Sequence, residues 1–405
     1  MHMAIPRSYQ GWTVLANGFR PFFLLGAVQA ALSILIWLPA FQGELTLSSA
    51  FTPRDWHVHE MLYGYLPAIV TGFLFTAIPN WTGRLPIRGA PLLALVTVWM
   101  TGRVTVTLSA LGPWWAALLI DASFLLLVVL AAAREITVGR NWRNLPVVAI
   151  VAVLCGGNVA FHIEAHLRGT ADHAIRVGVA VIVLLLALIG GRIIPSFTRN
   201  WLVKHNPGRL PTPFGRFDVA VLLVSVLSLL GWIVVPDNAV AGLALAAAGL
   251  IHAVRLARWA GDRTLRERLL VILHVGYAFV PLGFLLTAAA SVGWVLPSAG
   301  LHAWMVGAAG IMTLAVMTRA TLGHTGQVLT ASAATHVVYL GIIVAAVTRI
   351  CAVLVPDHAG ALLHVAAIAW IIAFSGFVLA FGPLLLGLKL RALATRSAGS
   401  AQPAL

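Results

Sequence analysis

The stretch HVHEMLYGYLPAIVTGFLFTAIPN, residues 57–80, joins a long apolar run to two histidines at its start. Glu60 is the only Asp, Glu, Lys or Arg in it. A helix needs about 20 apolar residues to cross a bilayer, so this stretch is predicted to span a membrane. The same rule gives twelve candidate spans in all, roughly at 19–41, 57–80, 90–110, 114–133, 145–166, 173–197, 217–235, 239–257, 269–290, 300–321, 331–355 and 360–388.

The composition excludes most other classes of protein. Of the 405 residues, 60% are hydrophobic and 9% are charged, and the mean hydropathy is +0.96. Soluble domains average about 25% charged residues, and a disordered chain is far less apolar. A membrane β-barrel shows short alternating strands instead of long apolar runs. The predicted fold class is therefore an all-α polytopic membrane protein of about twelve transmembrane helices.

The basic residues set the expected topology. The net charge is +14, from 26 Lys and Arg against 12 Asp and Glu. In a soluble protein this would indicate nucleic acid, but in a membrane protein basic residues collect in cytoplasmic loops. A cytoplasmic N-terminus puts 20 of the 26 inside and only Arg54, Arg168 and Arg176 outside. We therefore expect both termini in the cytoplasm, one membrane domain over 1–390, a cytoplasmic tail over 391–405, and no nucleic-acid partner.

The N-terminal residues and the cysteines agree with a polytopic membrane protein. Residues 1–12 are polar and mixed, and no cleavage site follows an early apolar run, so no signal peptide is predicted. Cys155 and Cys351 both lie inside apolar runs. A disulfide framework is therefore not indicated.

An internal repeat is suggested by two similar span ends. Ile78-Pro79-Asn80-Trp81-Thr82 and Ile194-Pro195-Ser196-Phe197-Thr198 are offset by 116 residues, and His57 and His173 open the same spans at the same offset. Basic segments follow the fourth, eighth and twelfth spans. We infer three units of four helices, near 19–133, 145–257 and 269–388. This plan is similar to that of the haem–copper oxidase core subunit, which by itself says nothing of function.

Fourteen histidines in so apolar a chain are the main candidates for chemistry, because ionisable groups inside a bilayer are costly and are functional candidates by default. Eight lie near predicted outer helix ends or loops: His57, His59, His162, His166, His173, His302, His358 and His364. Four lie further inward: His252, His274, His324 and His336. The carboxylates expected inside spans, all toward the outer side, are Glu60, Asp121 and Glu164.

His57 and His59 are about 200° apart around a helix, so both do not easily bind one metal. We expect one of them to be a ligand, while the other caps the helix, serves a second centre or faces water. Glu60 can orient one imidazole through its second ring nitrogen. The alternative is an interfacial cluster anchored by Trp56.

His162 and His166 are four residues apart and therefore share a helix face, a spacing that suits two imidazoles on one metal. The alternative is a solvated helix end. His302 and His364 open the tenth and twelfth spans, where each can be an axial haem ligand, a third copper ligand or a structural residue. Imidazoles suit Zn, Cu and Fe, so the set does not name the metal. His358, beside Asp357, is expected to be exposed.

Arginines inside spans are further candidates for cofactor binding. Each costs about 2.5–3.5 kcal/mol in lipid by insertion scales, so Arg192, Arg319 and Arg349 should face the bundle. A haem propionate would pair with such an arginine bidentately, although Arg192 and Arg319 can also extend to the inner headgroups. His324 lies between Gly323 and Gly326, which predict a turn there.

Several motifs together resemble the NnrS family, over most of the chain. They are Asn17-Gly18-Phe19-Arg20-Pro21-Phe22-Phe23, Trp56-His57-Val58-His59-Glu60-Met61, Thr71-Gly72-Phe73-Leu74-Phe75-Thr76-Ala77-Ile78-Pro79-Asn80-Trp81-Thr82-Gly83, Gly191-Arg192-Ile193-Ile194-Pro195-Ser196-Phe197-Thr198 and Leu322-Gly323-His324-Thr325-Gly326. The resemblance implies a haem- and copper-containing protein of the bacterial inner membrane, associated with denitrification and with tolerance of nitric oxide under nitrosative stress.

The leading hypothesis is a haem b site and a copper site in the outer half of the bundle, where nitric oxide is bound and reduced. The expected metal region comprises His57, His59, His162 and His166, completed by His302 and His364, with His173 in reserve. Arg103 and Arg349 are the expected propionate partners, and Arg192, Arg319 and His324 are further cofactor-binding candidates. Glu60, Asp121 and Glu164 are candidate proton carriers.

The electron donor would be a quinol or a periplasmic cytochrome c. No proton path from the cytoplasm is evident in the sequence, so coupled proton pumping is not expected. Two alternatives stay open at this point. Intramembrane histidines and repeats also fit a haem or metal transporter, and a nitric oxide sensor or metal-homeostasis protein would bind without turnover.

Overall fold

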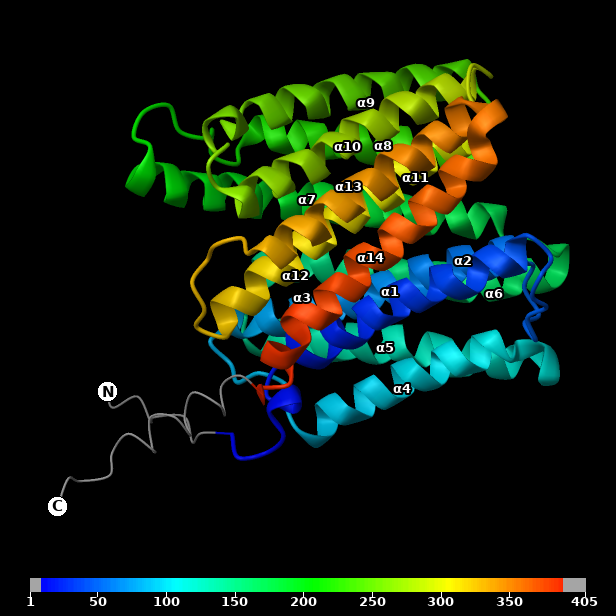
Figure 1. Ribbon diagram of the computed structural model, residues 1–405, viewed down its shortest axis with the longest axis horizontal. Helices are drawn as coiled ribbons and strands as arrows, with labels where there is room; N and C mark the ends of the chain where they lie inside the picture. The colour runs from blue at the N-terminus through cyan, green and yellow to red at the C-terminus, as the bar shows by residue number, and fades with distance from the viewer. Residues whose placement is uncertain (1–8, 389–405) are drawn as a thin grey trace.

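The computed structural model describes residues 9–388, in which twelve helical spans are long and apolar enough to cross a membrane and no strand occurs. This confirms the predicted fold class. Ten of the spans are single helices or begin or end with a short 3₁₀ turn. Their α-helices are α1 (Phe19–Phe41), α4 (Ala90–Thr107), α5 (Trp114–Val138), α6 (Leu145–Arg168), α7 (Asp172–His205), α8 (Arg216–Val234), α9 (Ala239–Ala257), α10 (Arg268–Ser291), α13 (Ala333–Leu354) and α14 (Ala359–Leu385) (Figure 1).

The second and tenth spans are interrupted by π-helical turns that the sequence did not indicate. The second span consists of α2 (Pro53–His59), the π-helix η2 (Glu60–Tyr65) and α3 (Leu66–Thr82). The tenth consists of α11 (Ser298–His302), the π-helix η6 (Ala303–Gly310) and α12 (Ile311–His324). In each case a histidine immediately precedes the π-helix. Such turns are rare and occur frequently at functional sites.

Two predictions need correction. Helix α12 continues through Gly323 to His324, because a glycine inside a helix is tolerated, and only Gly326 takes a left-handed conformation, with φ +70°. The set of intramembrane carboxylates was also incomplete. Glu135 and Asp218 lie within α5 and α8, and both are buried. Each carboxylate pairs with an arginine from another part of the chain, Arg84 and Arg255 respectively. The pairing offsets the free-energy cost of burying the charge.

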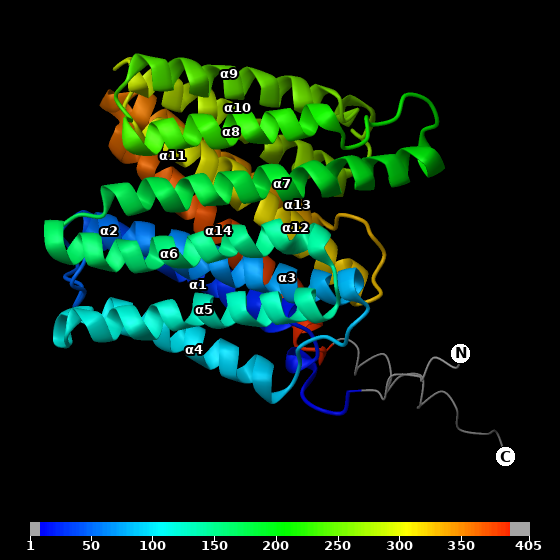
Figure 2. The same cartoon turned by 180° about the vertical axis from the view of Figure 1, so that it is seen from behind.

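Burial within the bundle follows a period of four spans. The second, sixth and tenth spans are 72, 67 and 72% buried, whereas the third, fourth, seventh, eighth, eleventh and twelfth are 33–44% buried. The second, sixth and tenth spans therefore form the centre, and the others cover them (Figures 1 and 2). The division into three units remains a prediction, and this period agrees with it.

The ring of helices closes between the first and last spans. The fourth helix of each proposed unit packs against the first helix of the next: α5 on α6, α9 on α10, and α14 on α1. The buried Arg20, near the start of α1, donates from Nη1 to the main-chain oxygens of Leu384 and Leu385, each at 2.9 Å. These bonds satisfy the free carbonyls at the end of α14, and they place the start of α1 and the end of α14 on the same side of the bundle.

Candidate metal and cofactor sites

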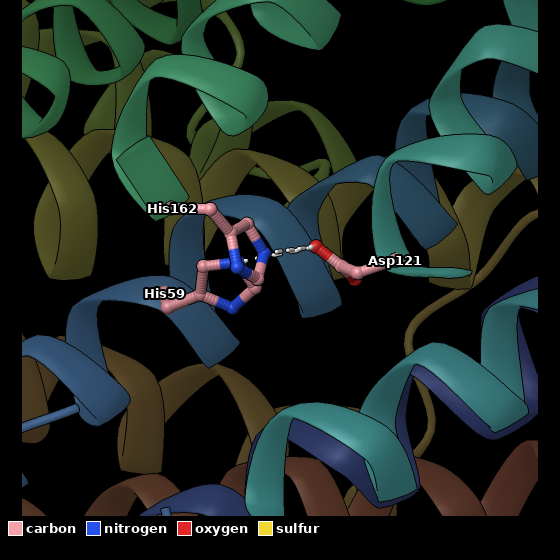
Figure 3. A group of neighbouring side chains, drawn as sticks. All are labelled: His59, Asp121 and His162. Atoms are coloured by element: carbon pink, nitrogen blue, oxygen red, sulfur yellow. Dashed lines mark hydrogen bonds and ion pairs between the residues drawn. The ribbon is translucent and has the colours of Figure 1, made fainter. Parts of the chain in front are cut away.

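His59, Asp121 and His162, here called the His–Asp–His group, meet inside the bundle from α2, α5 and α6 (Figure 3). All three are buried, and one ligand atom from each lies within 4.8 Å of the others. The Nε2 atoms of His59 and His162 are each 3.2 Å from Asp121 Oδ2, and both imidazoles point toward this carboxylate. Two nitrogens and one carboxylate oxygen are ligands that a transition metal accepts.

Two polar side chains orient this group. Asn158, one helical turn before His162 on α6, donates from Nδ2 to Asp121 Oδ2 at 2.8 Å, and its Oδ1 lies 3.0 Å from His59 Nε2. Glu60 Oε1 lies 3.4 Å from His59 Nδ1. A carboxylate on the second nitrogen of a ligand imidazole fixes the orientation of the ring.

The charges around the group leave a negative excess. Arg103, from α4, donates to Glu60 Oε1 at 2.6 Å and also pairs with Asp121. Glu60 Oε2 further accepts from Gln29 at 2.5 Å. Two buried carboxylates therefore face one arginine, and with neutral imidazoles the cluster carries one net negative charge. Since an uncompensated buried charge is costly, the cluster favours a bound cation.

A second site, here called the His57 pocket, lies on the other side of α2. It is a pocket lined by Ile34, Trp37, His57, His302, Val306, Ala345, Arg349, Leu363, Ala366, Ala367 and Trp370. The His57 ring stacks on Trp37 with 4.3 Å between centroids. His57 Nδ1 and Trp37 Nε1 are both buried without a hydrogen-bond partner in the described part of the chain. Such orphaned atoms call for a missing partner.

His302 and Arg349 supply the other polar groups of this pocket. His302 Nδ1 lies 2.6 Å from the main-chain oxygen of Ser298, which leaves Nε2 available. The guanidinium of Arg349, on α13, makes no hydrogen bond or ion pair with any residue between 9 and 388. Imidazoles, an arginine without an acidic partner and two tryptophans fit a haem, because the imidazoles can bind iron, the arginine a propionate and the indoles the flat ring.

Three predicted ligands lie outside both sites. His166 is exposed and stacks on Trp114, with centroids 4.4 Å apart, so His162 and His166 do not converge although they share a helix face. The reason is that α6 ends at Arg168, and its last turn faces solvent. His173 is exposed and bonds to Glu164. His364 is exposed beside Gln42, and its neighbour Leu363 lines the pocket instead.

The inner candidates also have partners elsewhere. Arg192 donates to Asn144 Oδ1 at 3.2 Å, Arg319 lies over the Phe197 ring at 4.5 Å, and His324 packs near Phe19. None of the three contributes to the two sites described above. His358 is exposed, as predicted.

Glu164 has a structural partner rather than a place in either site. Its carboxylate accepts hydrogen bonds from the main-chain N–H groups of His173 and Ala174, at 3.1 and 2.8 Å. These donors lie in the first turn of α7, where N–H groups have no partner within the helix. A carboxylate there caps the helix and complements its dipole, which gives Glu164 a role that the sequence did not reveal.

A third buried cluster was missed because its members are far apart in sequence. Arg255 on α9 donates to Asp218 on α8 at 2.8 Å and to the Tyr277 hydroxyl on α10 at 2.9 Å. His252 lies 2.9 Å from the same hydroxyl and 2.8 Å from Ser225 Oγ. Arg255 thus forms an ion pair with a carboxylate of the chain, Asp218, whereas Arg349 has no such partner among the described residues.

The sequence was compared with models of known protein families and with curated proteins. A family model described as NnrS protein matches residues 13–389, nearly the whole chain. No curated protein matches the chain significantly.

Proposed function

The chain belongs to the NnrS family, and we propose that it binds haem b in the His57 pocket and copper at the His–Asp–His group, and that it removes nitric oxide by reduction. The observation that carries the proposal is the divergence of two neighbouring imidazoles. His57 lines the pocket, whereas His59 belongs to the group, so α2 supplies both sites. Family membership fits a role in the response to nitric oxide, and the reaction is our inference.

Copper is favoured at the His–Asp–His group by its ligands and its charge. Imidazole nitrogens suit copper, and the net negative charge left by Glu60, Asp121 and Arg103 attracts a cation. His59 and His162 would be the nitrogen ligands and Asp121 the oxygen ligand. Asn158 and Glu60 hold these side chains in place before the metal arrives.

Haem is favoured in the His57 pocket by Arg349. The arginines of the two other buried clusters, Arg103 and Arg255, pair with carboxylates of the chain, whereas Arg349 has none among the described residues. A propionate would supply the missing carboxylate. His57 and His302 are the residues that would hold the haem iron, and the unpartnered nitrogens of His57 and Trp37 agree with a bound group there.

The proposed reaction consumes two nitric oxide molecules, two electrons and two protons, and forms nitrous oxide and water. The bound metals would supply the electron transfer and the binding of nitric oxide. The His–Asp–His group is buried, and His57, His302 and Arg349 are half-buried among apolar helices, so a small apolar gas can enter from lipid. The electrons come from an external donor, a quinol or a periplasmic cytochrome c, and we place the protein in the bacterial inner membrane with both ends cytoplasmic.

The proposal is tested on protein purified after expression with ample haem and copper. The pyridine haemochrome gives the haem type, metal analysis gives the copper content, and a nitric oxide electrode measures consumption with reductant present. Haem b with copper and consumption of nitric oxide supports the proposal. A haem spectrum that shifts with nitric oxide while none is consumed indicates a sensor. Folded protein without haem or copper overturns the proposal and favours a transporter.

A further inference from the structure

A second cavity lies between the three central spans, and the proposed chemistry does not use it. Its walls come from α3, α7 and α12, and its volume is about 70 Å³. Leu74, Leu185, Ile189, Met312 and Val316 are among the lining side chains, and no lining residue is exposed. The cavity is therefore built from the most buried spans of the bundle.

The chemistry of the walls excludes water. The only side-chain oxygen in the lining is that of Thr313, which already contacts the main-chain oxygens of Ala309 and Gly310 at 2.6 and 2.9 Å. A buried water needs two to four polar partners, and cavities lined by Leu, Ile and Phe stay dry and bind xenon or benzene. The walls thus fit a small molecule without hydrogen-bonding groups.

One side chain, Tyr65, connects this cavity with the His57 pocket. The Tyr65 hydroxyl lies 2.6 Å from Thr313 Oγ1, in the cavity wall. The Tyr65 ring packs edge-on against Trp370, a wall of the His57 pocket, with 6.2 Å between centroids. Tyr65 is fully buried and is the last residue of the π-helix η2. A single layer of aromatic side chains therefore separates the two spaces.

We propose that the central cavity, here defined by its α3, α7 and α12 walls, is a binding site for small apolar gases that stores nitric oxide and passes it to the His57 pocket beside Tyr65. The identity of the gas rests on the proposed function, whereas its class rests on the walls alone. A gas dissolved in the bilayer would partition into the dry cavity. The His57 pocket would then receive nitric oxide from the central cavity instead of directly from the lipid.

Xenon tests the site without any cofactor. Crystals of metal-free protein under xenon pressure should show an anomalous scattering peak between Leu185 and Val316. Val316→Phe and Ile189→Phe, on different helices, should each remove the peak by filling the space. Val104→Phe is the matched control, because Val104 is 58% exposed on the outer helix α4. Lack of xenon in the wild type, or density for an acyl chain in the cavity, overturns the proposal.

The transfer step is tested by flash photolysis of nitric oxide from the haem-loaded protein. Both filling variants should slow bimolecular rebinding severalfold, while Val104→Phe should leave it unchanged. Unchanged rebinding in variants that have lost xenon would overturn the transfer to the pocket. Failure of the proposed function gives a different result. In that case the protein takes up no haem and consumes no nitric oxide, but it still shows the xenon peak.

Discussion

His57 and His59 are separated by one residue on α2, and their imidazoles enter two different sites. His57 stacks on Trp37 in the pocket shared with His302 and Arg349. His59 points to the opposite side and meets Asp121 and His162. The angle of about 200° between such positions on a helix is what makes one short helix serve two centres.

This divergence predicts a clean separation of the two cofactors by mutation. His57→Ala should remove or strongly perturb the haem spectrum while copper is retained. His59→Ala should lower the copper content while haem stays bound, because His59 does not line the pocket. Absorption spectra and metal analysis of the two purified variants measure both quantities.

His166→Ala is the matched control, since His166 lies one turn from His162 on the same helix but faces solvent against Trp114. It should keep both cofactors at wild-type content. Loss of copper in His166→Ala together with full copper in His59→Ala would contradict the assignment of the His–Asp–His group.

Arg349 should control how firmly the haem is held. Arg349→Gln removes the only Lys or Arg among the described residues that line the His57 pocket, so haem should transfer to apomyoglobin faster than from the wild type. Arg349→Lys should lie between the two, because an ammonium attracts a carboxylate but lacks the bidentate geometry. Arg192→Gln serves as the control, as Arg192 bonds to Asn144 outside the pocket. Equal transfer rates for all four proteins would exclude a propionate at Arg349.

The sequence predicted the spans well because every helix that crosses a bilayer needs about 20 mostly apolar residues. Four predicted span starts, Phe19, Ala90, Trp114 and Ala239, are those of the structure. The angular argument for His57 and His59 was also local, and their imidazoles do diverge. The turn predicted around His324 begins one residue later, at Thr325, because Gly323 is accommodated within α12 and only Gly326 takes a left-handed conformation.

The sites themselves depend on contacts that no local pattern encodes. His59 and His162 are 103 residues apart, and Asp121 comes from a third helix. The spacing of His162 and His166 indicated the helix face of α6 that carries the site. The residue that joins His162 there is Asn158, one turn inward, which donates to Asp121; His166 does not take part. The π-helices and the partners of Arg255 likewise arise only from packing.

The buried pair Asp218–Arg255 should be a main determinant of stability. Arg255 is fully buried, so Asp218→Asn leaves its charge without compensation and should cost about 3–5 kcal/mol. The double variant Asp218→Asn, Arg255→Met removes both charges and should lose less than the single one. SDS-titrated unfolding in mixed micelles compares them. Strictly additive losses would show that the two charges do not interact.

Gly64 should be indispensable to the His–Asp–His group although it binds nothing. A Cβ added there would lie 2.5 Å from Arg103 Nη1. The guanidinium is held by Glu60 and Asp121, so it moves only by disturbing the carboxylate that the metal needs. Gly64→Ala should therefore lower copper affinity by about 10–100-fold, as is usual for disturbed outer-shell partners of a metal.

Gly156→Ala provides the control for this change. Gly156 is an exposed residue of α6, and an added Cβ would meet nothing within 4 Å. Alanine favours a helix over glycine by about 1 kcal/mol, so this variant should be as stable as the wild type or slightly more so, with unchanged copper affinity. Competition with a copper chelator measures both variants. If Gly64→Ala binds copper as the wild type does, Arg103 has no part in holding Asp121 toward the metal, and the charge argument for this site fails.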